Sequence, residues 1–515
     1  MPPADRRGRA AAASRPRRPG PARAPVVAVV AAALVAGLVL GRAGRPARPA
    51  AAQAPRAAAA PASALSSTWY CAGASARAGG VTPGSLVLSN TGRTPLRAAI
   101  TLFPDRGPVR HLGATVAADS RETFVETAPH GPSAVGASVT LDGGGASVEQ
   151  QVSGPLGITA TPCATTGSAR WYFATGATRV NAHDEIELLN PYPSTAIVDL
   201  TFTTNEGLEQ PQAFQAMVVR GDSLTAVDLG SQLRRRTSIA TTVTASTGRV
   251  VAWQAETVTP PRHGEVVLGT KAADRPDADP ASPFPGVSVT PGAPALSSMW
   301  LWPQGETQRG VEERYLVYNP GRRTARVKLS VHLATGTAEP FTVTVGPGQV
   351  SALTTASETR IPPGVGYSVS LRSTDGIPVV AERTVAAGPP ARVRGTAQLV
   401  GATAPARSWL VGAGAVDARL DELLAVSNPG RRPVVVTVDR LDPSGPAALP
   451  GLASVHIGAQ GSVDVNLSRV AAWLASPLVV RATGPVVVGR ELDGRGRSRG
   501  LGLSLGVPLT PAGGP

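Results

Sequence analysis

The sequence predicts an all-β protein of tandem immunoglobulin-like antiparallel β-sandwich domains that follow one N-terminal transmembrane helix. The first observation is an internal repeat of roughly 100 residues, which occurs four times and has the size of an immunoglobulin-like domain. The second is that each copy consists of short, β-branched, alternating segments separated by Gly, Pro or Asn, as is typical of antiparallel strands and turns. The third is one uncharged apolar run near the N-terminus.

The N-terminal segments indicate export. A basic head at 1–23 precedes eighteen uncharged residues at 24–41, which as a helix span about 27 Å, the thickness of a bilayer core. The excess of Arg before this span predicts a single-pass anchor with a cytoplasmic N-terminus and extracytoplasmic repeats. An Ala/Pro/Arg-rich stalk follows at 42–66. The alternative is a signal peptide cleaved near Ala50–Ala52, which would release a secreted protein.

Charge argues against a nucleic-acid partner. Of the net charge of +14, most lies in the first 60 residues, which hold eleven Arg and one Asp. The other 455 residues hold 38 basic and 34 acidic groups, too close a balance for an extended basic surface.

Each repeat opens with a Trp and continues through an apolar strand to an Asn. The spacing is 19 residues in the last three copies and 21 in the first. We therefore expect the Trp residues of the last three copies to share one buried position and the Asn residues another. The pairs are Trp69 and Asn90, Trp171 and Asn190, Trp300 and Asn319, and Trp409 and Asn428.

The repeats also set the predicted domain boundaries. We expect four β-sandwich units in a row, with the closing strand of the second unit at 264–271. A Pro-rich linker separates the two halves, and a short disordered tail ends the chain. The predicted units are 67–162, 163–272, 296–404 and 405–508, with the linker at 273–295 and the tail at 509–515.

The motifs resemble an uncharacterised repeat family of exported actinobacterial proteins, known only as a domain of unknown function. Three segments carry the resemblance: Trp171–Gly176, Asn190–Pro191 and Val379–Arg383. The first copy departs from the pattern, with Cys71 in place of the Phe and Thr91 in place of the Pro. No catalytic residues are established in that family, so the resemblance implies none here.

The only two cysteines, Cys71 and Cys163, bracket the first repeat. Outside the membrane such a pair predicts a disulfide; the alternative is two separate buried thiols. Two thiols without a nearby His cluster do not make a metal site, so we expect neither metal nor cofactor.

Other polar motifs are weaker. The sequence Gly221-Asp222-Ser223-Leu224 matches a serine esterase motif, but no Asp-x-x-His accompanies it, and we expect a β-turn. His183-Asp184-Glu185 is the densest polar group, although calcium needs more oxygen ligands at defined spacing. The run Arg234–Arg236 predicts a solvated loop.

Three aromatic side chains beside the opening Trp positions are candidates for contact with a glycan: Tyr70, Tyr172 and Trp302. Neighbours in a strand point to opposite faces, so one member of each aromatic pair is expected in the core and the other at the surface. The alternative is a core Trp with a rim aromatic that binds nothing.

These observations favour a non-enzymatic, membrane-anchored extracytoplasmic scaffold of the cell envelope. The alternative is an accessory factor of envelope polysaccharide assembly that binds a cell-wall glycan, a glycosyltransferase or another envelope protein. An exported serine hydrolase is a remote third reading, because the sequence shows no nucleophile paired with a base.

Overall fold

The computed structural model describes residues 57–75, 84–126, 134–274, 281–333, 336–412, 414, 420–470, 476–494 and 500–510. The predicted basic head, the predicted transmembrane segment at 24–41 and most of the stalk and tail lie outside these ranges. In the described part of the chain, no helix is long and apolar enough to cross a membrane.

The described residues form strands and short 3-10 helices, without an α-helix, in seven sheets. The all-β antiparallel prediction is therefore confirmed. The 3-10 helices are Gln212–Phe214, Leu229–Ser231, Lys271–Asp274, Thr355–Ser357 and Leu467–Arg469.

Each of the first three repeats contains two sheets that follow the same strand order. One sheet begins with the Trp-bearing strand, in the order β1-β6-β3-β4 in repeat 1, and the other ends with the last strand, in the order β5-β2-β7-β8. The strands of repeat 1 are β1 Ser67–Ser75, β2 Ser85–Asn90, β3 Leu96–Pro104, β4 Arg110–Val116, β5 Ser120–Val125, β6 Ala134–Leu141, β7 Ala146–Gly154 and β8 Gly157–Pro162.

Repeats 2 and 3 keep this arrangement and add short strands at the outer edge. Repeat 2 contains β9 Arg170–Phe173, β10 Ala182–Asn190, β11 Ala196–Thr204, β12 Gly207–Glu209, β13 Met217–Val219, β14 Ser223–Asp228, β15 Ile239–Thr247, β16 Val251–Val258 and β17 Gly286–Pro291. Repeat 3 contains β18 Met299–Glu306, β19 Val311–Asn319, β20 Ala325–Leu333, β21 Gly336–Thr337, β22 Phe341–Val345, β23 Gln349–Thr354, β24 Gly366–Ser373, β25 Val380–Ala387 and β26 Gly395–Val400.

Repeat 4 differs because one strand of 17 residues, β33, passes through both sheets and joins them. Its strands are β27 Ala406–Val411, β28 Leu420–Ser427, β29 Val434–Arg440, β30 Ala447–Ala448, β31 Val455–Ile457, β32 Ser462–Asn466, β33 Leu478–Gly494, β34 Leu501–Leu505 and β35 Val507–Pro508.

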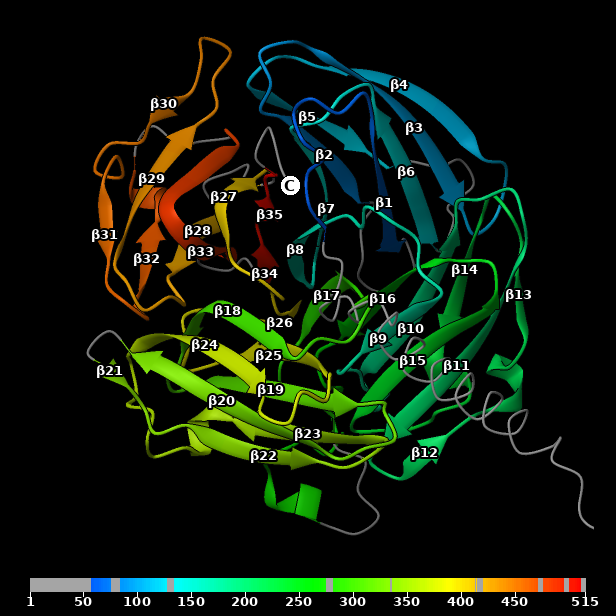
Figure 1. Ribbon diagram of the computed structural model, residues 1–515. Helices are drawn as coiled ribbons and strands as arrows, with labels where there is room; N and C mark the ends of the chain where they lie inside the picture. Colours follow the sequence, from blue (N-terminus) through cyan, green and yellow to red (C-terminus); the bar gives the residue numbers. More distant parts are fainter. Residues whose placement is uncertain are drawn as a thin grey trace, which may run out of the picture. The chain divides into compact units, whose positions relative to one another are not determined.

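The four repeats form a closed ring rather than the expected row. Their last strands, β8, β17, β26 and β34, contact one another in cyclic order near the centre of Figure 1, with β34 returning to β8. Glycines allow the backbones to approach: a Cβ on Gly286 would lie 2.3 Å from the Thr396 amide nitrogen, and one on Gly502 would lie 2.9 Å from the Ile158 carbonyl oxygen. The row was wrong because strand patterning within a repeat carries no information on how repeats pack.

The ends of the described chain meet at the ring closure. Ala59 N–H donates to the Pro508 carbonyl at 3.0 Å, and the Thr510 hydroxyl donates to the Ala59 carbonyl at 2.9 Å. The segment before β1 is thus joined to the end of the described chain by one main-chain and one side-chain hydrogen bond.

The repeated Trp and Asn residues occupy equivalent positions. The indoles of Trp171, Trp300 and Trp409 are buried, and each donates Nε1–H to a carbonyl 77 or 79 residues downstream. The buried amides of all four repeat asparagines donate Nδ2–H to the carbonyl four residues on and accept from the N–H two residues on. Each Asn therefore replaces main-chain partners that the following turn lacks.

The second repeat closes differently from the prediction. The strand expected at 264–271 is absent from the sheet, and its place beside β16 is taken by β17, inside the predicted linker 273–295. An insertion between β16 and β17 places the closing strand further along the chain than in the other repeats. The apolar segment at 264–271 lies closer to β16 in the sequence but does not pair with it. Residues 286–291 of the predicted linker are consequently part of repeat 2.

Candidate functional site at the junctions between repeats

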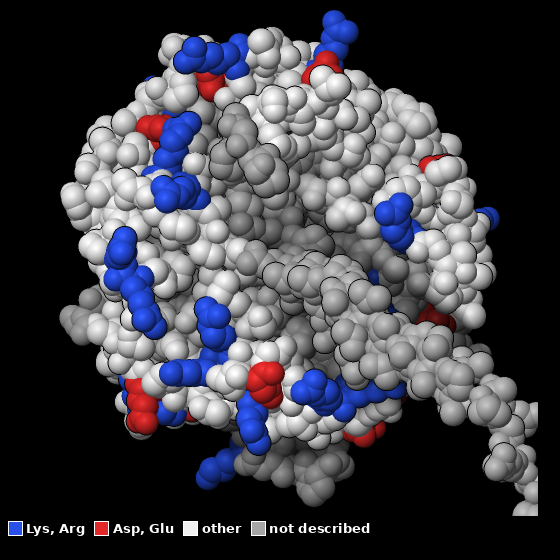
Figure 2. Space-filling model, in the orientation of Figure 1, with Lys and Arg blue, Asp and Glu red and all other residues white. Residues whose placement is uncertain are grey.

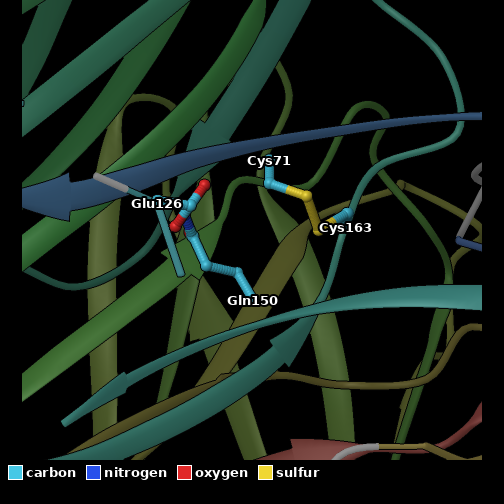
Figure 3. The surroundings of a disulfide bond; sticks show 4 residues. All are labelled: Cys71, Glu126, Gln150 and Cys163. Carbon is cyan, nitrogen blue, oxygen red and sulfur yellow. A yellow bond between two sulfur atoms is a disulfide. The ribbon is translucent and has the colours of Figure 1, made fainter. Parts of the chain in front are cut away.

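The predicted disulfide is confirmed. Cys71 on β1 bonds to Cys163, which follows β8, with a Cα–Cα distance of 4.8 Å (Figure 3). The neighbouring residues Tyr70 and Ala164 exchange two main-chain hydrogen bonds, so the bridge ties the opening strand of repeat 1 to its closing end.

The predicted glycan-contact residues are mostly buried. Trp302 has no exposed surface and donates Nε1–H to the Leu399 carbonyl at 3.1 Å, so it is not available to a glycan. Tyr172 is also buried, because the outer side of its strand packs against the core of repeat 3. For Tyr172 the alternation argument failed because the neighbouring repeat covers the face that would otherwise meet solvent. Trp302 is two residues from Trp300, so alternation places both on the same face, where Trp302 packs against Tyr315 of its own repeat. Tyr70 alone of the three is half-buried; burial raises its pKa to about 12.

The other polar motifs lie in ordinary structural settings. Ser223 begins β14 after a turn, and its hydroxyl donates to the Arg220 carbonyl at 2.8 Å. His183 lies 3.5 Å from both Glu185 and Asp228. Within the described ranges, no cluster of three His, Cys, Asp or Glu side chains is suited to hold a metal ion. Arg236 pairs with Glu209 at 2.7 Å.

A polar cluster that the sequence reasoning missed recurs inside the repeats. The cluster has three members. An acid lies six residues before the repeat Asn, and a Gln or Arg lies on the strand that pairs with the strand of this acid. The third member is a Gly five residues after the repeat Trp. The three sets are Gly176, Asp184 and Gln254; Gly305, Glu313 and Arg383; and Gly414, Glu422 and Arg490. The fixed spacings from Trp and Asn were the signal that could have revealed it.

In repeat 2 the cluster is a carboxylate held by an amide. Gln254 Nε2–H donates to both oxygens of Asp184, at 2.9 and 3.0 Å, with both side chains fully buried. Burial raises the pKa of Asp184 well above its usual value, and the cross-strand neighbour Glu256 raises it further. Gly176 is needed because a Cβ there would lie 2.4 Å from Asp184 Oδ2.

In repeat 3 the same position holds an ion pair. The Arg383 guanidinium lies 2.9 Å from Glu313, both buried, and the Tyr315 hydroxyl donates to the same carboxylate. Burial alone would lower the pKa of Arg383, but the charges of Glu313 and its neighbours raise it. A buried pair of this kind is costly to break because one charge would be left without a partner.

Repeat 1 replaces the cluster with a different acid. Position 84, which corresponds to the acid, is Gly, and Gln150 instead donates Nε2–H to Glu126 at 2.9 Å. Both side chains are buried beneath β1, the strand that carries Cys71 (Figure 3). Burial raises the pKa of Glu126 to about 7.

Further buried carboxylates bind the segment that follows the opening Trp of the adjacent repeat. Glu187 of repeat 2 accepts from Gly73 N–H of repeat 1 at 2.8 Å, and Glu382 of repeat 3 accepts from the Thr175 hydroxyl of repeat 2 at 2.7 Å. Burial raises the pKa of Glu187 well above its usual value and that of Glu382 to about 7. Each such contact crosses a junction of the ring.

The closing junction, between repeats 4 and 1, combines such a contact with an ion pair. Glu149 accepts from Gly412 N–H at 2.6 Å and pairs with the Arg490 guanidinium at 3.0 Å. Both charged side chains are 1% exposed, and 341 residues separate them in the sequence. At the junction between repeats 3 and 4, Gly489 stands at the position that corresponds to Glu149 and faces Pro303, and Arg392 pairs with Asp421 at 3.7 Å.

Two hollows lie at the junctions. One is an apolar cavity of about 120 Å³ lined by all four repeats, including the indoles of Trp171, Trp300 and Trp409. The other is a polar groove between repeats 2 and 3, where Glu256 and Gln398 lie. On the face drawn in Figure 2, Lys and Arg side chains are scattered and do not merge into one basic patch.

Residues 133–408, more than half of the chain, match a family of unknown function, DUF5719. The chain belongs to DUF5719. The family assignment agrees with the uncharacterised family expected from the motifs. No curated protein matches this DUF5719 member in sequence.

Solved structures give weak likenesses to this DUF5719 protein. Thermotoga maritima 1070 is 20% identical, with a TM-score of 0.19, over 21% of this chain and 94% of its own. A tetra-tandem repeat from the extending region of a large adhesion protein is 14% identical, with a TM-score of 0.10, over 82% and 94%. Streptomyces avermitilis α-L-rhamnosidase complexed with L-rhamnose is 8% identical, with a TM-score of 0.13, over 79% and 54%.

The first prediction concerns Gly176→Ala. The added methyl group would meet the buried Asp184 carboxylate, so we expect the variant to lose more than about 3 kcal/mol of unfolding free energy in urea titrations. Gly207→Ala is the matched control, because Gly207 also has a positive φ, 117°, but a Cβ there would have no other atom within 4 Å. That variant should lose only about 1–2 kcal/mol. Equal losses would show that backbone strain, not contact with Asp184, decides the effect.

The second prediction concerns Glu149→Ala, which leaves Arg490 buried without its carboxylate. We expect a loss of about 3–5 kcal/mol in the same measurement. The control is Asp439→Ala, which breaks the more exposed pair with Arg481 and should cost less than about 1 kcal/mol. A small loss for both variants would contradict the role assigned to the closing junction.

The third prediction concerns pH. Glu126 has a pKa of about 7 when folded and 4.5 as a free side chain, so the folded state binds more protons between these values. Its contribution to stability is therefore full below pH 4.5 and is lost as pH rises towards 7. Glu126→Gln should flatten this fall in unfolding free energy by about 3 kcal/mol at most. The exposed Glu122→Gln is the control, and an unchanged pH profile for Glu126→Gln would refute the assignment.

Proposed function

We propose that this DUF5719 protein is a non-enzymatic, membrane-anchored extracytoplasmic scaffold of the cell envelope. In this proposal residues 24–41 hold the chain in the membrane, and the four repeats are immunoglobulin-like β-sandwiches. The observation that carries it is the use of buried acidic groups: Glu149, Glu187, Glu313 and Glu382 bind partners within and between repeats. Acidic groups that bind partners in this way stiffen the framework and are not available as catalytic acids or bases.

Two further features support the proposal. The disulfide between Cys71 and Cys163 is typical of an oxidising, extracytoplasmic compartment. Ser223, the residue on which a hydrolase would depend, is the first residue of β14, and its hydroxyl donates to the main-chain carbonyl of Arg220.

The fourth prediction tests the topology. Protease added to intact protoplasts should degrade the repeats, because the Arg-rich head places them outside the membrane. A cytoplasmic protein serves as the control for lysis. Full protection of the repeats until the membrane is permeabilised would contradict the proposal, and release into the medium would favour the secreted alternative.

A further inference from the structure

The polar groove between repeats 2 and 3 consists of two adjoining hollows. The deeper one, about 120 Å³, is lined by Arg179, Glu256, Gln398 and Phe284, and the outer one, about 520 Å³, by Asn205 and other polar residues. Three residues line both hollows and so connect them: Ser238, Arg314 and Leu316.

Only side chains of β19 and β25, the strands under the groove, are available to bind a ligand. β19 is hydrogen-bonded to β23 on one side and β25 on the other, and β25 is hydrogen-bonded to β19 and β26. Their main-chain groups are therefore used within the sheet. An extended peptide that binds by adding a strand finds no free edge on β19 or β25.

Two groups at the groove have unused binding capacity. The half-buried Arg314 guanidinium makes no hydrogen bond or ion pair with any described residue, although it has five N–H donors. Gln398 is 7% exposed and donates Nε2–H to Glu256, but its Oε1 accepts no hydrogen bond from the described chain. A buried polar atom without a partner is unfavourable and is commonly satisfied by water or a ligand.

The groove is particular to this junction. The residue five positions before the repeat Asn is Arg314 in repeat 3 but Ser85, Glu185 and Leu423 in the others. No other repeat thus places a cation at this point of its sheet. The Arg serves no contact that the ring requires.

We propose that this groove binds a saccharide that carries a carboxylate. The Arg314 fork binds the carboxylate in two parallel hydrogen bonds. Hydroxyl groups of the sugar donate to Gln398 Oε1 and exchange hydrogen bonds with the Thr384 hydroxyl, which lines the same hollow. The ring of Phe284 offers an apolar face against which a sugar ring packs.

The test is calorimetric titration of the full chain in detergent with trigalacturonate, maltotriose, acetate and a tetraglutamate peptide. We expect trigalacturonate to bind more tightly than the other three. Arg314→Gln should weaken it at least about tenfold, as loss of a charged hydrogen bond predicts. Thr384→Val, which keeps the side-chain shape, should weaken it severalfold. Arg322→Gln, in an exposed turn of the same repeat, should leave it unchanged.

Several outcomes would overturn the proposal. No trigalacturonate binding at millimolar concentration would remove the site, and binding unaffected by Arg314→Gln would place it elsewhere. If maltotriose bound as tightly as trigalacturonate, the groove would not recognise the carboxylate. If acetate bound as tightly, the groove would not recognise the sugar. Tighter binding of tetraglutamate would show that the ligand is an acidic peptide and not a saccharide. Melting curves of both groove variants must match the parent, and Thr384→Val decides the matter if Arg314→Gln fails to fold.

Discussion

The ring depends on carboxylates that are buried where one repeat meets the next. A carboxylate removed from water is unfavourable unless hydrogen-bond donors surround it, and the adjacent repeat supplies those donors. Glu149 obtains them from Gly412 and Arg490, and Glu187 from Gly73. Each repeat is therefore incomplete without its neighbour, because a separated repeat would leave these groups unsatisfied. Such junctions select one arrangement of the repeats, whereas apolar contacts alone would tolerate several.

The groove between repeats 2 and 3 also places polar groups at a junction, but some of these groups have no partner in the described chain. At other junctions Glu187 and Arg490 each bind a group of the adjacent repeat, but the Arg314 guanidinium and Gln398 Oε1 make no hydrogen bond with the described chain. Specificity for a ligand requires polar groups that the fold itself leaves without partners, held in place by a framework that does not need them. A rigid ring with an unpaired Arg314 guanidinium at one junction meets both conditions.

The sequence predicted local features well and distant ones poorly. The positions of the Trp and Asn residues and the strand pattern follow from short spacings, and the disulfide follows from the presence of only two cysteines; the structure agrees with all of them. The contact between Glu149 and Gly412 joins residues 263 apart, and no pattern within a repeat indicates it. The burial of Tyr172 was missed for the same reason, since repeat 3 covers it, whereas Trp302 lies two residues from Trp300 and therefore shares its buried face. The β17 strand was missed because an insertion shifted its position, whereas the recurring Gly, acid and Gln or Arg could have been found from their fixed spacing.

The hydrogen bond from Ala59 to Pro508 brings the two ends of the described chain together, and this bears on the order of the repeats along the polypeptide. Because Ala59, near the start of the described chain, already lies beside Pro508 near its end, a short peptide linker could join the two ends. New termini could then open in the insertion between β16 and β17, and the four junctions would remain as they are. The order in which the repeats follow one another along the polypeptide is thus separable from the order in which they pack, and a circularly permuted chain would have the same junctions to satisfy.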